Sequence, residues 1–432
     1  MIAHVALSPI RVLILSAWCA RITSALVGIF SLRILNAELD HNQYAIYIVI
    51  IGISGWFTIF GDPGFGFYIQ NKISEKIAKD EKYGADILSA YILLGSVAIL
   101  ITMFTYLYKS PISYFLFHRI EAGTDHNLEI IFWFSALVLA VSVAVSASNK
   151  FLYAVGRGYI GNIIAALASM VGLLILMYGL KNSENKIIYS IFATCGPPMA
   201  FSLALAALQI KKSWENHYLI NIKMLINVLV SSKGFFIFSL LGALVVQTDY
   251  MIMSQKVDSI DIVQYYNLAK IFGIMVFINQ AILYAIWPNF TQKYIKKEHD
   301  YIYNNIVKIA VLTSLITIIG TTFIIYFSGY LGLLLSSDPL IEYQKIVILS
   351  FGIVAILRCI VDPYSIFLQS INDTKPLIIF LAIQAPICFT LQWVLSTYLS
   401  IVGILLGLAC SIIFTVLWML PNEVKNKLSL ST

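Results

Sequence analysis

Charged and polar side chains interrupt a stretch of the sequence that is otherwise apolar. Arg358, Asp362, Ser365 and Gln369 stand at positions i, i+4, i+7 and i+11, which places them on one face of a helix. Such a face avoids lipid, because a charge inside a bilayer is costly and belongs in a bundle interior or a water-filled cavity. The pattern predicts either a cavity wall that binds a ligand or an Arg358–Asp362 ion pair that only holds helices together. Pro363, next to Asp362, favours a kink at this point.

Two further charged positions lie in the first apolar stretches of the chain. Arg21 and several small residues after it stand at helical spacing, and so do Gly55, Thr58 and Asp62. Both positions are predicted to lie in the cytoplasmic half of the membrane, so an Arg21–Asp62 bridge is geometrically possible. Arg21 is therefore a candidate ligand-binding cation, and the purely structural bridge is the alternative.

A third set lies in two consecutive apolar stretches of the second half of the chain. At a rise of about 1.5 Å per residue, Asp249 and Lys270 both lie roughly 10 to 12 Å below the outer membrane surface. We predict that they pair. Asn267 and Gln280 share the broad side of Lys270, which extends the polar wall. Since a buried ion pair contributes little to stability, its presence suggests a switch or a ligand site.

Other kinds of chemistry find no support in the sequence. The 5 cysteines lie inside apolar stretches and the 6 histidines in or beside polar loops, so neither a metal site nor a disulfide framework is predicted. The chain has no phosphate-binding G-x-x-x-x-G-K-[ST] motif and no G-x-S-x-G or H-E-x-x-H motif. We expect no cofactor and no catalytic residues.

The composition explains which elements must position these residues. Of 432 residues, 59% are hydrophobic and 12% charged, whereas soluble domains carry about 25% charged residues. The mean hydropathy is +0.86. A chain of this kind is a polytopic membrane protein. Its net charge of +6 is distributed over loops between apolar stretches and does not imply a nucleic-acid partner.

The apolar stretches predict an all-α protein with about twelve transmembrane helices, each of about 20 residues. We place six of them before and six after the middle of the chain. The predicted spans are 12–35, 44–69, 87–108, 129–149, 159–180, 187–209, 236–255, 262–288, 306–334, 344–369, 377–397 and 401–420. A tight turn at 397–400 separates the last two spans.

Basic residues in the loops predict the orientation of the chain. They cluster at 70–86, 210–234 and 289–305, and the positive-inside rule places these loops in the cytoplasm. Loops near Gly123 and Ser336 are then external. Both termini are expected to be cytoplasmic.

The longest polar stretch divides the chain into two lobes. The boundaries are 1–209 for the N-terminal lobe, 210–235 for a cytoplasmic linker and 236–432 for the C-terminal lobe. Within the linker, the apolar segment 218–230 suits either an interfacial helix or a plain connection.

The two lobes resemble each other in sequence. A shift of 221 residues aligns Gln43-Tyr44 with Gln264-Tyr265 and Lys72 with Lys293. An even number of spans in each lobe keeps the copies in the same orientation. We therefore predict two six-helix lobes related by a pseudo-two-fold axis along the membrane normal.

Specific residues in the first lobe resemble a known family. They are Tyr44-Ala45-Ile46-Tyr47, then Asp62-Pro63-Gly64-Phe65-Gly66, then Asn71-Lys72. This succession resembles the bacterial O-antigen and polysaccharide flippases (Wzx-type), a branch of the superfamily that also holds the multidrug and toxic-compound extruders. Ala45 replaces the usual glycine and Pro63 the usual bulky apolar residue. In the second lobe, Gln264–Ala269 and Trp287-Pro288 are similar to the family's repeat of these elements.

The resemblance implies a function and partners. A member of this family is expected to move an undecaprenyl-pyrophosphate-linked oligosaccharide across the cytoplasmic membrane for lipopolysaccharide biosynthesis, by alternating access. The expected partners are this lipid-linked oligosaccharide, membrane lipids and other membrane proteins of polysaccharide assembly. The family implies a cation-lined lumen, which Arg21, Lys270 and Arg358 would supply, with Asn267 and Gln369 as polar neighbours. Asp62, Asp249 and Asp362 are the candidate coupling or ion-pair residues.

Two other functions remain open at this point. A multidrug antiporter of the same fold needs a net acidic cavity, and three intramembrane basic residues weigh against it. An integral-membrane enzyme, such as an O-antigen polymerase or a lipid-linked glycosyltransferase, could use only the Glu38-x-Asp40 pair in the first external loop.

Overall fold

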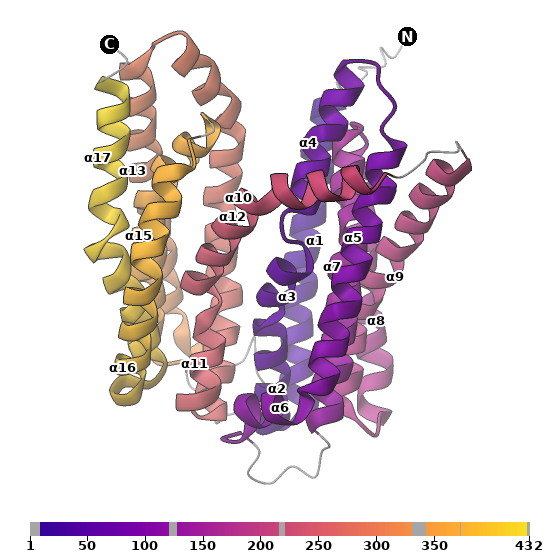
Figure 1. The fold of residues 1–432 in the computed structure, drawn as a ribbon. Helices are drawn as coiled ribbons and strands as arrows, with labels where there is room; N and C mark the ends of the chain where they lie inside the picture. The colour runs from indigo at the N-terminus through magenta and orange to yellow at the C-terminus, as the bar shows by residue number, and fades with distance from the viewer. Residues whose placement is uncertain (1–8, 121–127, 216–220, 331–342, 372, 430–432) are drawn as a thin grey trace, which may run out of the picture. The chain divides into compact units, whose positions relative to one another are not determined.

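A computed structural model describes residues 9–120, 128–215, 221–330, 343–371 and 373–429. In these ranges the chain is helical and contains no strand (Figure 1). The all-α fold predicted from the apolar stretches is confirmed. The expected external loops around Gly123 and Ser336 lie outside the described residues.

The chain divides into two compact units, Met1–Ser239 and Leu240–Thr432. The helices of the first unit are α1 (Pro9–Glu38), α2 (His41–Gly52), α3 (Ser54–Gly61), α4 (Phe65–Ala78), α5 (Gly84–Leu107), α6 (Lys109–Phe117), α7 (Leu128–Ala154), α8 (Gly158–Gly179) and α9 (Lys186–Glu215). Helix α10 (Ile222–Val246) runs across the division. Those of the second unit are α11 (Thr248–Lys256), α12 (Ser259–Ile295), α13 (His299–Tyr326), α15 (Lys345–Ser370), α16 (Lys375–Phe414) and α17 (Val416–Ser429).

Ten segments among the described residues are long and apolar enough to cross a membrane. One of them, Lys375–Ser429, has 55 residues and contains Ser400, whose φ of 48° interrupts the helical backbone of α16. This interruption lies at the turn predicted between the last two spans. Helix α12 has 37 residues and is not one of the ten. The count of twelve spans and the pseudo-two-fold axis stay predictions.

Large apolar side chains on the outside of the helices show which solvent the fold requires. Leu100 on α5 is 65% exposed, and Ile319 and Phe323 on α13 are 68% and 62% exposed. A soluble protein does not expose apolar residues along whole helices, whereas lipid solvates them without cost. The protein is therefore a multi-pass membrane protein.

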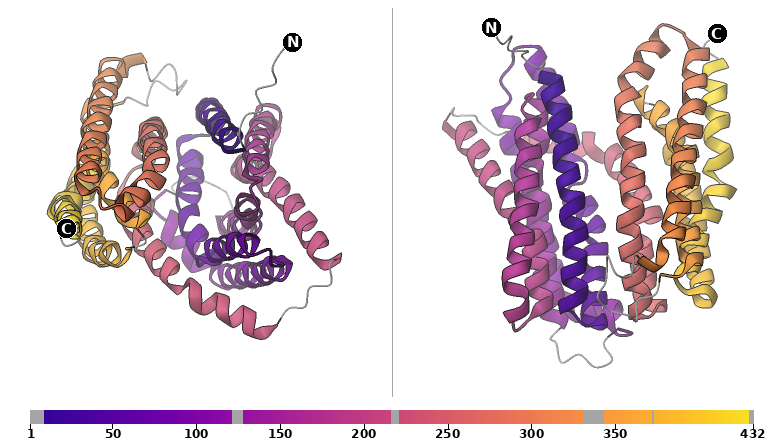
Figure 2. Two further views of the ribbon diagram at one scale, coloured as in Figure 1. Left: turned by 90° about the horizontal axis from the view of Figure 1, so that it is seen from above. Right: turned by 180° about the vertical axis from the view of Figure 1, so that it is seen from behind.

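The core of the first unit joins α4, α5 and α7. Phe65, Ile69 and Ile73 recur along α4 at helical spacing and are buried against Leu94 of α5. Val228 of α10 belongs to the same core and is 1% exposed. In the view from above, most long helices of this unit point along the view, α9 is inclined, and the first half of α10 lies across them (Figure 2). The interfacial position expected for part of the linker stays a prediction.

Candidate functional site

The polar stripe predicted on one helix face lies on α15. Arg358, Asp362, Ser365 and Gln369 are each partly exposed, whereas Phe367 on the same helix is completely buried. The helix continues through Pro363 from Lys345 to Ser370 without a break. Helical periodicity therefore predicted correctly which residues of α15 share this face, and the helix does not end at Pro363.

Contacts within this stripe leave the arginine weakly paired. Arg358 Nη2 lies 3.7 Å from Asp362 Oδ2, which exceeds hydrogen-bond length, and 35% of its side chain is exposed. Asp362 Oδ2 also accepts a hydrogen bond from Gln280 Nε2 of α12 at 3.0 Å. Gln369 Nε2 donates to Ser365 Oγ at 3.1 Å. The guanidinium therefore keeps hydrogen-bond donors that a ligand can use.

The pairing predicted for Asp249 is not found. Asp249 is 8% exposed, and its carboxylate accepts hydrogen bonds from Tyr265 Oη at 2.5 Å and from the Tyr250 amide at 2.8 Å. Lys270 is exposed, with its amine 5.0 Å from the centre of the Tyr266 ring. The structure shows no salt bridge between Asp249 and Lys270. The Tyr265 hydroxyl donates a hydrogen bond to the Asp249 carboxylate instead.

Asn267 does not lie on an open wall as expected. Its side chain is completely buried and donates from Nδ2 to Tyr343 Oη at 2.8 Å. Tyr343 directly precedes α15, and burial raises the pKa of its hydroxyl to about 12, so the phenol stays neutral at physiological pH. Asn267 therefore joins α12 to the beginning of α15.

In the first unit, Asp62 occupies an elbow between α3 and α4. Gly64 adopts a left-handed φ of 84°, and Asp62 Oδ1 accepts a hydrogen bond from the Gly66 amide at 2.9 Å. Asp62 Oδ2 accepts from Lys150 Nζ of α7 at 2.6 Å. The ion pair found at Asp62 is therefore with Lys150, which lies one residue beyond the predicted span 129–149. Arg21 lies exposed on α1.

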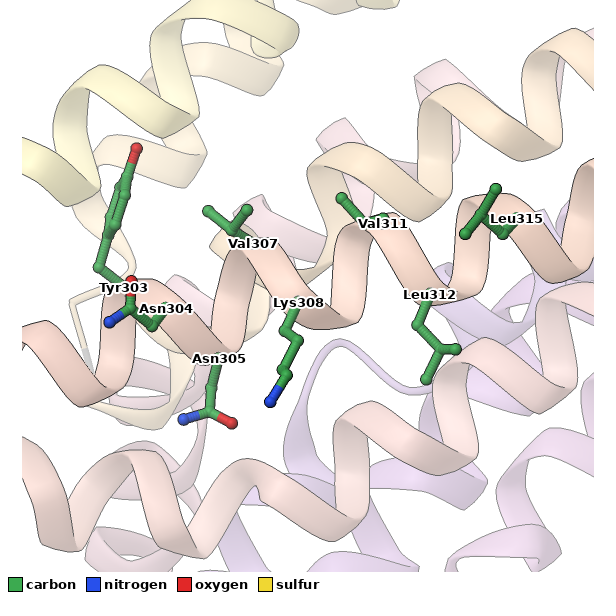
Figure 3. A pocket seen from close by; sticks show the side chains of 8 residues that line it. All are labelled: Tyr303, Asn304, Asn305, Val307, Lys308, Val311, Leu312 and Leu315. Atoms are coloured by element: carbon green, nitrogen blue, oxygen red, sulfur yellow. The ribbon is translucent and has the colours of Figure 1, made fainter.

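A further basic residue, Lys308, lies on α13. Lys308 is exposed beside a hollow of about 760 Å³, which is also lined by Asn304 and Asn305. Asn305, Lys308 and Leu312 project to the same side of the helix (Figure 3). The spacing of Asn304, Asn305 and Lys308 just before an apolar run is the signal that could have identified this position from sequence.

One buried carboxylate at the beginning of α5 forms salt bridges with two lysines of α4. Asp86 is 0% exposed and lies 3.0 Å from Lys72 Nζ and 2.6 Å from Lys76 Nζ. The cluster carries a net positive charge. Among the described residues, no group of three or more His, Cys, Asp or Glu side chains is arranged to hold a metal ion.

Comparison with known proteins finds relatives that are similar to nearly the whole chain. No protein-family model matches the sequence. A protein of Yersinia pseudotuberculosis named as an O-antigen export protein is 30% identical over 415 residues, covering 95% of this chain and 94% of the relative. A protein of Salmonella typhimurium named as an O-antigen transporter is 34% identical over 417 residues, covering 94% of each chain.

Solved structures show the fold class. An inward-facing multidrug transporter of the MATE family, in the MOP superfamily, aligns with a TM-score of 0.73 and 14% identity over 95% of this chain and 96% of its own. The lipid II flippase MurJ in an inward closed conformation aligns with a TM-score of 0.73 and 14% identity over 96% and 90%. Since the curated relatives share 30% or more of their residues along nearly the whole sequence, the chain belongs to the O-antigen transporter family of multi-pass bacterial inner-membrane proteins.

Proposed function

We propose that the protein is a flippase that translocates an undecaprenyl-pyrophosphate-linked oligosaccharide across the cytoplasmic membrane. The observation that carries this proposal is full-length similarity to O-antigen transporters in a chain that has the fold of a lipid II flippase. In this proposal, the two units expose the substrate alternately to the two sides of the membrane.

Arg358 is the residue that we assign to the pyrophosphate. Its guanidinium is partly exposed on the polar face of α15, and its distance to Asp362 is too long for a hydrogen bond. A guanidinium binds phosphate oxygens through two parallel hydrogen bonds. Gln369, about three turns along the same face, is a further candidate for contact with the headgroup or the sugar.

Arg21 and Lys270 are the other two candidate cations of the pathway. Both are exposed within their own units. Asp249 is hydrogen-bonded to Tyr265 and forms no salt bridge with Lys270, so among the described residues the Lys270 amine has no carboxylate partner. We assign Asn267 a positioning role through Tyr343 rather than a contact with substrate, since its side chain is completely buried.

The three aspartates divide into different roles in this proposal. Asp62 fixes an elbow through Lys150, and Asp249 fixes α11 to α12 through Tyr265. Asp362 lies beside Arg358 and accepts a hydrogen bond from Gln280, so it can compete with a phosphate for the guanidinium. Only Asp362 is therefore placed to couple substrate binding to rearrangement of the stripe.

The orientation of the chain is part of the proposal. Basic loops support a cytoplasmic position for both termini, with six spans in each lobe. Reporter fusions within 70–86 and 289–305 are expected to give cytoplasmic signals, and fusions near Ser336 periplasmic ones. A cytoplasmic signal near Ser336 would contradict the twelve-span arrangement.

Complementation tests the function in the cell. The gene is expressed in a bacterium that makes the matching repeat unit but lacks its own O-antigen flippase. We expect restored surface polysaccharide at a normal amount of the protein in the inner membrane. Accumulation of the lipid-linked unit without surface polysaccharide, in cells that hold the folded protein, would contradict the proposal.

A further inference from the structure

The first unit contains a polar cavity that none of the residues assigned above to the substrate lines. It has a volume of about 330 Å³ and lies among α3, α7, α8 and α9. Its polar lining consists of five hydroxyl residues and one amide, namely Ser54, Thr58, Ser142, Ser146, Asn149 and Ser202. A concentration of hydroxyl groups in the interior of an apolar helix bundle requires hydrogen-bond partners.

Two of these groups have no hydrogen-bond partner among the residues that the structure describes. Ser142 Oγ and Asn149 Oδ1 are buried and make no hydrogen bond among the described residues. Ser202 is 8% exposed and lines the same cavity. A buried polar atom without a partner costs about 1 to 3 kcal/mol. The cavity therefore holds donors and acceptors that are ready for a ligand.

The other hydroxyls of the wall retain acceptor capacity. Thr58 Oγ1 donates to the Ser54 carbonyl at 3.1 Å, and Ser146 Oγ donates to the Val143 carbonyl at 2.8 Å. Each hydroxyl oxygen can still accept a hydrogen bond after donating its own proton. The wall thus offers both acceptors and donors to a ligand that itself carries hydroxyl groups.

The chemistry of the lining selects the ligand class. None of the described residues that line the cavity is Lys, Arg, Asp or Glu, so it does not suit a phosphate or a metal cation. Its remaining lining is aliphatic and includes Val143, Ile164 and Pro198. A sugar ring presents hydroxyl groups around its edge and C–H groups on its faces, which matches this mixture of surfaces.

The cavity is accessible and small. Thr58 and Ala165 are exposed, so it opens to the surface of the unit. Its volume lies near the lower limit of small-molecule sites, about 300 to 1,000 Å³. One sugar ring fits this space, whereas a whole repeat unit does not.

We propose that this cavity of the first unit binds one uncharged sugar residue of the lipid-linked oligosaccharide. This inference rests on the proposed flippase function and adds a saccharide subsite that is separate from the Arg358 stripe.

Binding to two lipid probes tests the subsite. The full-length protein in lipid nanodiscs is titrated with undecaprenyl pyrophosphate that carries the oligosaccharide, and separately with bare undecaprenyl pyrophosphate. The Ser142→Ala/Ser202→Ala double variant removes two hydroxyls of the wall. We expect about tenfold weaker binding of the glycosylated lipid, as two lost hydrogen bonds imply, and unchanged binding of the bare lipid.

A filled cavity and a matched serine provide the controls. Ala165→Leu places an apolar side chain at the mouth and is expected to weaken binding of the glycosylated lipid alone. Ser135→Ala removes a hydroxyl two turns earlier on α7, where it already donates to the Ile131 carbonyl at 2.6 Å and does not line the cavity. This control is expected to bind both lipids as the wild type does.

The outcomes separate the two proposals. If the wild type binds neither lipid, the flippase function is contradicted. If the wild type binds both lipids but the cavity variants keep full affinity for the glycosylated one, the cavity holds only water and the sugar subsite is wrong. Equal losses for both lipids would also overturn it, because the bare lipid has no sugar to place in the cavity.

Discussion

Lys150 of α7 donates a 2.6 Å hydrogen bond to Asp62, which lies 88 residues earlier in the chain. The same carboxylate accepts the Gly66 amide through its other oxygen at 2.9 Å. One aspartate thus holds the end of α3, the beginning of α4 and the side of α7 together. Asp62, Gly64 and Gly66 are residues of the motif by which the chain resembles its family, and the structure gives that motif a physical role.

We expect loss of Lys150 to destabilise the first unit. The Asp62 side chain is 6% exposed and that of Lys150 25%. Lys150→Met leaves a buried carboxylate unpaired and should lower the free energy of unfolding by about 2 kcal/mol, less than for a fully buried pair. Thermal unfolding of the purified protein in detergent measures this loss of stability. Lys79→Met is the matched control, because its partner Glu75 is an exposed residue one turn earlier.

A double-mutant cycle isolates the pair. Asp62→Asn combined with Lys150→Met should cost less than the sum of the two single changes, because the second change removes the unpaired charge. Strictly additive losses would show that the two residues do not stabilise each other.

A side chain at Gly66 should disrupt the same elbow. A Cβ atom there would lie 2.5 Å from Asp62 Oδ2 and 2.8 Å from Lys150 Cδ. We expect Gly66→Ala to lower the melting temperature and the amount of protein in the membrane. Gly95→Ala on α5 is the control, since a Cβ at that position meets no atom within 4 Å. Equal melting temperatures for the two variants would contradict the proposed close packing.

The Tyr265 hydroxyl should matter more than that of Tyr250. Tyr265→Phe removes the 2.5 Å hydrogen bond to Asp249 and leaves the carboxylate with a backbone donor only. We expect a loss of about 1 to 3 kcal/mol in unfolding free energy. Tyr250→Phe changes the neighbouring ring in the same way without removing a hydrogen bond of the described residues. A Tyr250→Phe loss as large as that of Tyr265→Phe would argue against this assignment.

Arg358 should depend on its shape as well as its charge. Arg358→Lys keeps the charge but cannot form two parallel hydrogen bonds to a phosphate, so we expect reduced polysaccharide export with a normal amount of protein. Arg358→Ala should abolish export. If Arg358 only pairs with Asp362, Asp362→Asn should do the same damage and lower protein abundance. Surface polysaccharide, normalised to membrane protein, distinguishes these results.

The sequence predicted features that depend on local periodicity. Helical spacing alone identified the partly exposed face of α15 that carries Arg358 and Gln369, because neighbours along one helix are fixed by its geometry. Hydropathy identified the protein as a membrane protein, because it too depends on residues that are close together in the sequence. The family that the Asp62–Gly66 segment indicated is confirmed by the full-length O-antigen transporter relatives.

Pairing between helices could not be predicted in the same way. Asp249 and Lys270 were matched by depth, but depth does not fix rotation about a helix axis, and Tyr265 reaches the carboxylate first. Lys150 lies just beyond the predicted span 129–149, whereas α7 continues to Ala154 and the Lys150 amine reaches Asp62. The cavity beside Ser142 could not be predicted from the sequence, because its lining comes from four helices whose arrangement in space must be known first.

Transport in a purified system tests the central claim most directly. Proteoliposomes containing the protein receive an undecaprenyl-pyrophosphate-linked oligosaccharide, and a membrane-impermeant enzyme that modifies the sugar reports how much of it is exposed outside. We predict that the exposed fraction changes with time in vesicles with the wild-type protein, and far more slowly with Arg358→Ala. An exposed fraction that changes no faster with wild-type protein than in protein-free vesicles would contradict the account.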